Sequence, residues 1–222
     1  MTKAIFPAAT VVILRDSVNG LEVLLLRRAK AVAFAGGSWV FPGGRIDPAD
    51  YAGGDDIELA ARNAAVRETM EEASLPITDG DLEYYSHWTA PEETPKRFAT
   101  WFFMAAIGAD VDVVVDGGEI DLHQWYTPAD ALDAVDRKEI QLLPPTFVTL
   151  FELSNYQTVD EALAYSRARP TPSYLPKMTF VDDGVCMLYP GDAGYDAKQN
   201  DIDGDRHRFW MMPDGWRYEK TE

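Results

Sequence analysis

Apolar and β-branched residues form two runs near the start of the chain, at residues 10–14 and 21–28. Asn19 and Gly20 lie between the runs, and an Asn-Gly pair is a strong signal for a tight hairpin turn. We therefore expect the two runs to form a β-hairpin. A small, glycine-containing loop at 29–38 follows, and later runs of the same kind predict strands at 39–41, 82–88, 97–107 and 120–126.

Apolar residues at helical spacing begin after Asp55, which is followed by Glu58 as in a capping box. This pattern predicts a helix over residues 56–73, with a stripe of alanines that would let it pack closely against a sheet. Threonine caps and first-turn prolines predict further helices at 128–136, 144–154 and 159–168. Beyond residue 170 we expect a proline-rich loop and short strands that end in a hairpin turned by residues 213–215.

The composition is that of an ordinary globular protein, with 46% hydrophobic residues in a chain of 222. This length suits one domain with an extension. The single cysteine, Cys186, has no internal disulfide partner, and the chain does not start like a signal peptide, so we expect a cytoplasmic location. The longest apolar stretch, 8–14, is far below the roughly 20 residues that span a bilayer, so we expect no membrane segment.

The net charge restricts the partners of the protein. Thirty-seven acidic and 20 basic residues give a formal charge of −17, which argues against binding a nucleic-acid backbone. A polyphosphate substrate would be repelled by the same charge. It would have to be held by bound cations and a few local arginines.

Three carboxylates stand at i, i+3 and i+4 in the predicted helix: Glu68, Glu71 and Glu72. Their side chains converge on one face, where like charges repel. A hard divalent cation such as Mg²⁺ or Mn²⁺ prefers carboxylate oxygens and would compensate this repulsion. The alternative is a solvated acidic face, which is common on helices.

The sequence around these carboxylates resembles the Nudix box of a hydrolase family. The resemblance rests on a Pro-Gly-Gly turn at 39–45 and an Arg-Glu-x-x-Glu-Glu run at 67–75. About nine extra residues, roughly 51–59, separate the two parts. Asp50 stands where the pattern has Glu, Thr69 where it has an apolar residue, and Ser74 where it has the closing Gly. Such an interrupted box is similar to that of the coenzyme A diphosphatase-like branch, as is the segment 97–103.

The resemblance implies an α/β (α+β) fold, the Nudix α/β/α sandwich around a mixed sheet. On this basis we expect a Nudix hydrolase domain at residues 1–155. A C-terminal extension of helix and strands at 156–222 would pack on the same domain. The extra residues at 51–59 should lengthen the loop before the helix and leave the carboxylates near the turn, because loop length is thermodynamically inexpensive.

The resemblance also implies a metal site. Glu68, Glu71 and Glu72 would bind Mg²⁺ or Mn²⁺ together with the backbone carbonyl of Gly43. Arg67 would orient a glutamate, with a surface pair with Glu71 as the alternative. The general base would be a box glutamate, Glu71 or Glu72, or an acid on a late strand. Glu119 is the candidate there, with plain solvent exposure as the alternative.

Substrate phosphates would be held by Gly44 and by arginines, whose planar forks match phosphate oxygens. Arg45, Arg97 and Arg28 are the candidates, each against the alternative of ordinary surface charge. Because Arg27 and Arg28 alternate along a strand, we expect at most one of them to act. The pair formed by His207 and Arg208 resembles a motif of the same branch, with a structural role as the more common reading for such a histidine.

The expected activity is hydrolysis of a pyrophosphate bond in a small-molecule nucleoside-diphosphate-linked compound, with coenzyme A or an acyl derivative favoured by the branch resemblance. ADP-ribose or a dinucleotide is the alternative within the class. A catalytically silent domain that senses a nucleotide-like ligand is the alternative outside it, and the intact carboxylates argue against it. A homodimer is left open.

Overall fold

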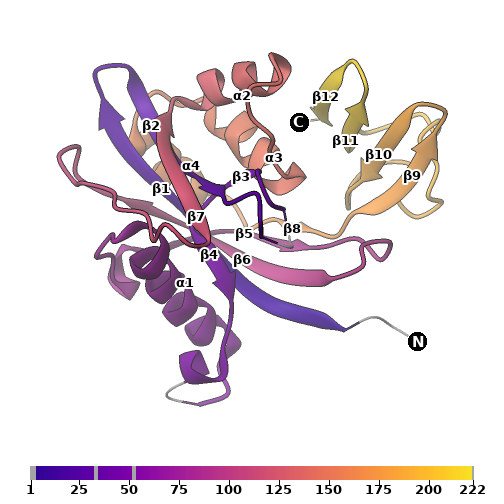
Figure 1. Ribbon diagram of the computed structural model, residues 1–222. Coiled ribbons are helices and arrows are strands. Elements are labelled where there is room, and N and C mark those ends of the chain that lie inside the picture. Colours follow the sequence, from indigo (N-terminus) through magenta and orange to yellow (C-terminus); the bar gives the residue numbers. More distant parts are fainter. Residues whose placement is uncertain (1–3, 33–34, 52–53, 222) are drawn as a thin grey trace.

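The computed structural model describes residues 4–32, 35–51 and 54–221. Within these residues a mixed eight-stranded sheet has the order β3-β2-β1-β6-β5-β8, with β4 also paired to β1 and β7 to β2 (Figure 1). The strands are β1 (Ile5–Ser17), β2 (Gly20–Arg28), β3 (Trp39–Val40), β4 (Gly43–Arg45), β5 (Glu83–Thr89), β6 (Arg97–Ala106), β7 (Ile120–Tyr126) and β8 (Ser173–Tyr174).

The β1–β2 hairpin divides this sheet. The two strands pair only next to their turn, from Leu14 opposite Val23 to Ser17 opposite Gly20. Farther from the turn, β4 takes the place beside β1 and β3 takes the place beside β2. The segment that links β3 to β4 therefore lies in the gap between the diverging strands.

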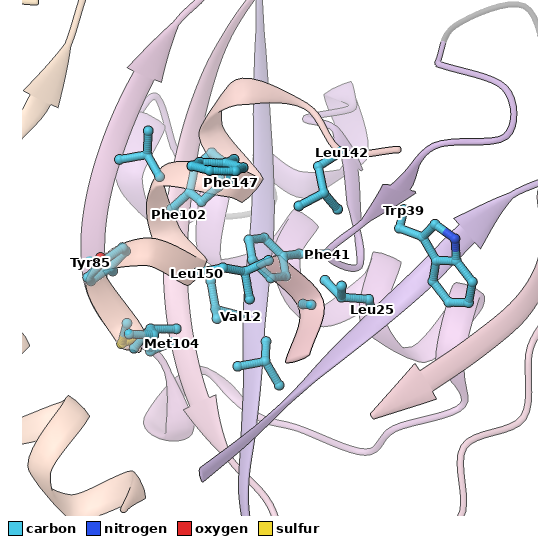
Figure 2. Close-up of a cluster of buried hydrophobic side chains, with 14 of the residues drawn as sticks. Val12, Leu25, Trp39, Phe41, Tyr85, Phe102, Met104, Leu142, Phe147 and Leu150 are labelled. Atoms are coloured by element: carbon cyan, nitrogen blue, oxygen red, sulfur yellow. The ribbon is translucent and has the colours of Figure 1, made fainter. Parts of the chain in front are cut away.

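Helices cover both faces of the sheet (Figure 1), and the α/β/α sandwich is confirmed. The helix α1 (Ile57–Ala73) lies on one face, where its fully buried alanines pack against Val11 and Ile13 of β1. The other face carries α2 (Pro128–Asp136), α3 (Pro144–Leu153) and α4 (Val159–Ala168). Alternate β1 residues, Val12 and Leu14, join the core on that side, which Figure 2 shows around Phe41, Phe102 and Phe147.

The predicted elements lie within a few residues of the observed ones, with three differences. The first strand begins at Ile5 rather than at residue 10, because it pairs in parallel with β6 along its whole start. The N-cap of α1 is Asp56, which accepts from the amides of Glu58 and Leu59, rather than Asp55. The turn after Pro42 continues as the short strand β4.

Two departures from the Nudix pattern have visible consequences. Ser74 ends α1 in the left-handed conformation, with φ 55°, where a glycine is normally favoured. Its hydroxyl donates to the Val114 carbonyl at 3.0 Å, which helps to hold this conformation. Thr69 is fully buried, and its hydroxyl has no hydrogen-bond partner in the described part of the chain, as expected for a position that usually carries an apolar side chain.

A second sheet is formed by the end of the chain, in the order β12-β11-β10-β9. Its strands are β9 (Lys177–Val181), β10 (Gly184–Leu188), β11 (His207–Met212) and β12 (Gly215–Lys220). One face is held by a buried ion pair, in which Arg208 donates twice to Asp192 at 2.7 Å. Asp192 also accepts from the His207 amide, so the loop after β10 is fixed over this face.

Glu152 of α3 joins the second sheet to the first. Tyr85 of β5 and Tyr174 of β8 donate to this carboxylate, and Arg169 and Lys220 lie at 3.3 and 3.5 Å from it. Strands from both sheets therefore share one buried charge. The division of the chain at residue 155 stays a prediction.

None of the helices in the described residues is long and apolar enough to cross a membrane.

We predict that Asp192→Asn lowers the free energy of unfolding by about 3–5 kcal/mol, because Arg208 is left buried without a charged partner. Denaturant unfolding measures this loss. Asp196→Asn is the matched control, because Asp196 is exposed and forms a surface ion pair with Lys177 at 3.4 Å. Its effect should stay within about 0.5 kcal/mol. Equal stability of the two variants would contradict the structural role of the buried pair.

Candidate functional site

The Pro-Gly-Gly turn meets α1 at the carboxylates. The Gly43 amide donates to Glu72 Oε2 at 2.9 Å, so the two separated parts of the box are in direct contact. The extra residues 51–59 run from the end of the short 3₁₀ helix (Pro48–Tyr51) to the first turn of α1, and residues 52–53 lie outside the described residues. The insertion therefore lengthens the approach to the helix, as predicted, and leaves the turn beside Glu72.

Glycine is required at Gly43, and a side chain at Gly44 would displace the Glu68 carboxylate. A Cβ atom at Gly43 would stand 2.4 Å from the Ala9 carbonyl oxygen, which is fixed backbone. A Cβ atom at Gly44 would stand 2.4 Å from Glu68 Oε1. The missing side chains thus let the turn lie between β1 and the carboxylate of α1.

Arg67 is the centre of the polar contacts beside the turn. Its Nε and Nη2 donate to the two oxygens of buried Asp50 at 3.0 and 2.9 Å. Its Nη1 donates to Glu68 at 2.8 Å and to Glu71 at 3.1 Å. The surface pair with Glu71 is thus only one of several contacts. Asp50 also accepts from the Asp47 amide, so it caps the local turn and holds Arg67 as well.

The three box carboxylates differ in their environments. Glu72 is only 5% exposed, whereas the Glu71 side chain is 59% exposed and Glu68 lies between them. Burial raises the pKa of Glu72 to about 8; the Gly43 hydrogen bond opposes this shift, and the charges of Glu68 and Glu119 add to it. Burial also raises the pKa of Glu68, against the opposing bond from Arg67.

These residues suit a divalent cation by their chemistry. They offer hard carboxylate oxygens, and the raised pKa values of Glu68 and Glu72 show that buried negative charge is not fully compensated by protein groups. In the described part of the chain, no three His, Cys, Asp or Glu side chains are gathered into a ready-made metal cluster. Arg67 Nη1 lies between Glu68 and Glu71 and supplies positive charge there.

Two neighbouring arginines of β2 form separate ion pairs with β7 and the residue before it. Arg28 pairs with Glu119, and its side chain is only 13% exposed. Arg27 donates to both oxygens of Asp121, at 2.7 and 2.9 Å. Arg28 and Glu119 line the cavity described below, whereas Arg27 and Asp121 are not among its lining residues. Because neighbouring residues of a strand point to opposite faces, Arg28 points toward the cavity and Arg27 points away from it.

A cavity of about 710 Å³ starts at this corner of the protein. Its charged end is formed by the glycine turn and nearby side chains: Gly43, Gly44, Arg45, Glu68, Arg28 and Glu119. From there it extends between the first sheet, the start of α3 and the second sheet, where most lining side chains are apolar. Glu71 and Glu72 lie outside the lining, with Glu72 behind Gly43.

One of the substrate-binding candidates from the sequence is not at this cavity. Arg97 is 4% exposed, donates to the Ala90 carbonyl at 3.0 Å and is absent from the cavity lining. Its neighbour Lys96 lines the cavity instead, with its ammonium 5.1 Å from the Phe98 ring centre. Lys96 directly precedes β6, and no local pattern indicated which of these two adjacent cations would reach the cavity.

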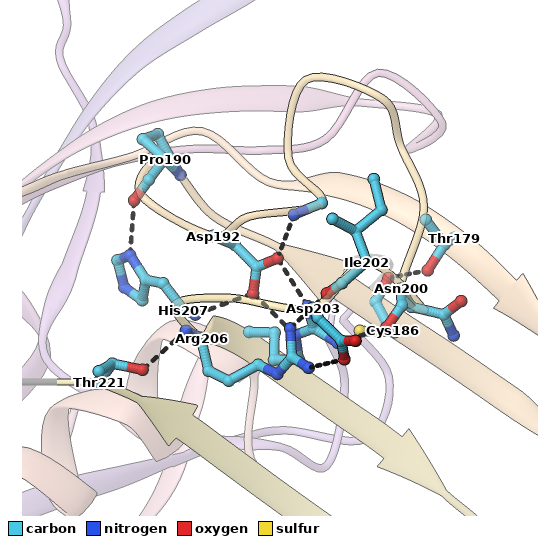
Figure 3. Close-up of polar contacts among 12 residues, drawn as sticks. Thr179, Cys186, Pro190, Asp192, Asn200, Ile202, Asp203, Arg206, His207 and Thr221 are labelled. Atoms are coloured by element: carbon cyan, nitrogen blue, oxygen red, sulfur yellow. Dashed lines mark hydrogen bonds and ion pairs between the residues drawn. The ribbon is translucent and has the colours of Figure 1, made fainter.

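The histidine and arginine of the extension have structural partners. His207 contacts the Pro190 carbonyl at 2.7 Å and the Tyr218 hydroxyl at 3.0 Å, as Figure 3 shows for Pro190. Arg208 is bound to Asp192. From the sequence, Trp88 could either stack on a base or be buried. It is 5% exposed, stacks on Tyr174 with 3.8 Å between ring centres and also lines the cavity.

Comparison with known proteins agrees with this geometry. The NUDIX domain family matches residues 5–145. A NUDIX hydrolase from Alicyclobacillus acidocaldarius superimposes with a TM-score of 0.67 at 25% identity, over 74% of this chain and 97% of that one.

The chain also resembles the acyl-coenzyme A diphosphatase NUDT19 of Xenopus laevis. The two are 22% identical over 86% of this chain and 76% of the relative. NUDT19 of Homo sapiens is 27% identical over 63% of this chain, and the match spans only 40% of that relative. The protein belongs to the NUDIX family, and it is a Nudix hydrolase of pyrophosphate bonds.

Proposed function

We propose that the protein hydrolyses the pyrophosphate bond of coenzyme A or an acyl derivative with the help of Mg²⁺ or Mn²⁺. The observation that carries this proposal is the cavity of about 710 Å³, which joins a charged end at Glu68 and Gly44 to a long apolar part. This volume lies in the upper part of the range of about 300–1,000 Å³ for small-molecule sites. The substrate class is supported by the similarity to acyl-coenzyme A diphosphatases.

Glu68, Glu71 and Glu72 are the proposed metal ligands, together with the carbonyl of Gly43. A divalent cation bound there would supply positive charge to the diphosphate and would lower the pKa of a water molecule. Arg67 positions Glu68 and Glu71 through its Nη1 and is itself held by Asp50. The Gly43 amide fixes the orientation of the Glu72 carboxylate.

The general base is proposed to be Glu72 or Glu119. Glu72 is a candidate because its buried carboxylate lies beside the glycine turn where the cation is proposed to bind. Glu119 lines the cavity and is half-exposed, so it can reach a water molecule beside a bound diphosphate, and its ion pair with Arg28 keeps it oriented.

The diphosphate is proposed to lie against Gly44, Arg45 and Arg28, which border the same end of the cavity as Glu68. The two arginines are needed to hold the diphosphate because the protein as a whole carries a formal charge of −17 and would repel it. Arg97 is no longer proposed to touch substrate, since its guanidinium is buried against the Ala90 carbonyl.

Two alternatives are less well supported. ADP-ribose carries a polar ribose at the end where this cavity is mostly apolar. A silent ligand sensor would have no need of three carboxylates on one helix face. A screen of coenzyme A, an acyl-coenzyme A and ADP-ribose with Mg²⁺ and with Mn²⁺ tests the proposal. Hydrolysis of ADP-ribose alone would overturn the substrate assignment.

We predict that Glu71→Gln or Glu72→Gln lowers turnover on the order of 10²-fold or more, because the neutral amide no longer holds the cation. Steady-state kinetics at saturating Mg²⁺ and a thermal unfolding curve provide the measurement. Glu58→Gln, in the first turn of the same helix and paired with Arg62, is the control and should keep turnover. Activity of the first two variants within a few-fold of wild type would refute the metal assignment.

Metal affinity should rise with pH. The pKa of Glu72 is about 8 without metal, so this carboxyl is protonated below that value, and the cation must displace the proton to bind. Calorimetry at pH 7 in two buffers of different ionisation enthalpy should therefore detect proton release, which disappears above about pH 9. Glu72→Gln should release no such proton. Affinity independent of pH between 6 and 9 would contradict the buried, protonated state.

We predict that Glu119→Gln lowers kcat by about 10²- to 10⁴-fold with little change in KM, if Glu119 acts as the base. Asp121→Asn is the matched control, because it breaks the equivalent ion pair with Arg27 outside the cavity. A non-hydrolysable diphosphate analogue should still bind Glu119→Gln more tightly with Mg²⁺ than with chelator. Unchanged kcat would leave Glu119 as a partner of Arg28 and assign the base to Glu72.

A further inference from the structure

The second sheet has two faces with different surroundings. On one side of β10 and β11, Cys186, Leu188 and Arg208 are buried, and Asp192 of the following loop binds Arg208 there. This loop covers part of the back of the sheet. The opposite face is therefore the one available to the rest of the molecule.

Three methionines lie together on that opposite face. Met178 of β9 stands directly across from Met187 of β10. Met211 of β11 stands across from Val185, two residues from Met187 and hence on the same face. All three line the cavity that begins at Glu68 and Gly44.

The position of this methionine face is fixed by α3. Phe147 packs against Phe209 of β11 at 5.2 Å and against Trp216 of β12 at 5.8 Å between ring centres. Lys220 of β12 is 3.5 Å from Glu152 of the same helix. The second sheet thus forms a stationary wall, whereas the methionine side chains on it are unbranched and adaptable.

Aromatic side chains line the same cavity as the methionines. Trp88 stacks on Tyr174, with an angle of 3° between the rings, and meets the Tyr189 ring edge-on at 5.6 Å. Trp88, Tyr189 and Phe102 line the cavity with the methionines. Methionine thioethers donate no hydrogen bonds, so the methionine face offers no donor to the edge of a nucleobase. It suits a flexible apolar chain.

We propose that Met178, Met187 and Met211 form a subsite for an apolar chain carried by the diphosphate substrate, and that the C-terminal sheet thereby determines substrate preference. This inference rests on the proposed function for the charged end of the cavity. Adaptable methionines would accept chains of several lengths, because a thioether side chain fills irregular gaps at low cost.

Binding of methylenediphosphonate and of its butyl and octyl monoesters with Mg²⁺, measured by calorimetry on the full chain, tests the subsite without turnover. Wild-type affinity should rise with chain length, by up to about fourfold per added CH₂ group. The double variant Met178→Gln with Met211→Gln should bind the octyl ester at least about tenfold more weakly and methylenediphosphonate within about twofold of wild type.

Two control variants distinguish the effect of a polar side chain in the cavity from a loss of folding. Met212→Gln changes the next residue of β11, which lies on the back face outside the cavity, and should leave all affinities unchanged. Replacing Met178 and Met211 by Leu keeps the wall apolar and should preserve the preference for the octyl ester. Thermal unfolding of each variant verifies its fold.

Wild-type affinity that does not depend on chain length would overturn the subsite, and so would an equal loss in Met212→Gln. A larger loss for adenosine monophosphate than for the octyl ester would assign this wall to the nucleobase instead. Kinetics with coenzyme A and octanoyl-coenzyme A distinguish the two proposals. If neither is hydrolysed but the chain-length dependence remains, the proposed substrate fails and the subsite stands.

Discussion

The site depends on how the segment after Trp39 is inserted between the diverging strands β1 and β2. The Pro42 carbonyl accepts from the Val11 amide at 2.9 Å and from the Thr10 hydroxyl at 2.6 Å, so β1 holds the turn through two hydrogen bonds. The following residue, Gly43, donates to Glu72 on α1. Without this insertion, the gap between the strands would leave unpaired backbone, and the helix carboxylates would have no opposing wall.

The residues around that turn carry more negative than positive charge. Glu72 and Glu68 are buried to a degree that raises their pKa values, and Arg67 and Arg28 compensate only part of the charge. Arg67 is available for this because Asp50, at the position where the Nudix pattern has glutamate, binds its other donors. The corner therefore keeps excess negative charge that a bound cation would compensate, and an anionic substrate is proposed to bind there.

The C-terminal sheet turns this corner into the end of a larger cavity. Its attachment relies on Glu152, which accepts from tyrosines of β5 and β8 and lies near Lys220 of β12. A buried carboxylate is stable only when several partners share its charge, and here the partners come from distant parts of the chain. The same contacts that stabilise the fold therefore set the distance between the methionine face and the glycine turn.

Local signals in the sequence determined most of the elements and the chemistry of α1. Hydrophobic periodicity and caps predicted the helices closely, and the spacing of Glu68, Glu71 and Glu72 alone placed them on one helix face. Side-chain direction within strands and long-range packing were decided by the tertiary structure. Arg97, the first residue of β6, is buried against the Ala90 carbonyl, whereas Lys96 just before it reaches the cavity, and methionines from three C-terminal strands aligned on one face. Such outcomes depend on register and on contacts between residues far apart in the chain, which no local pattern encodes.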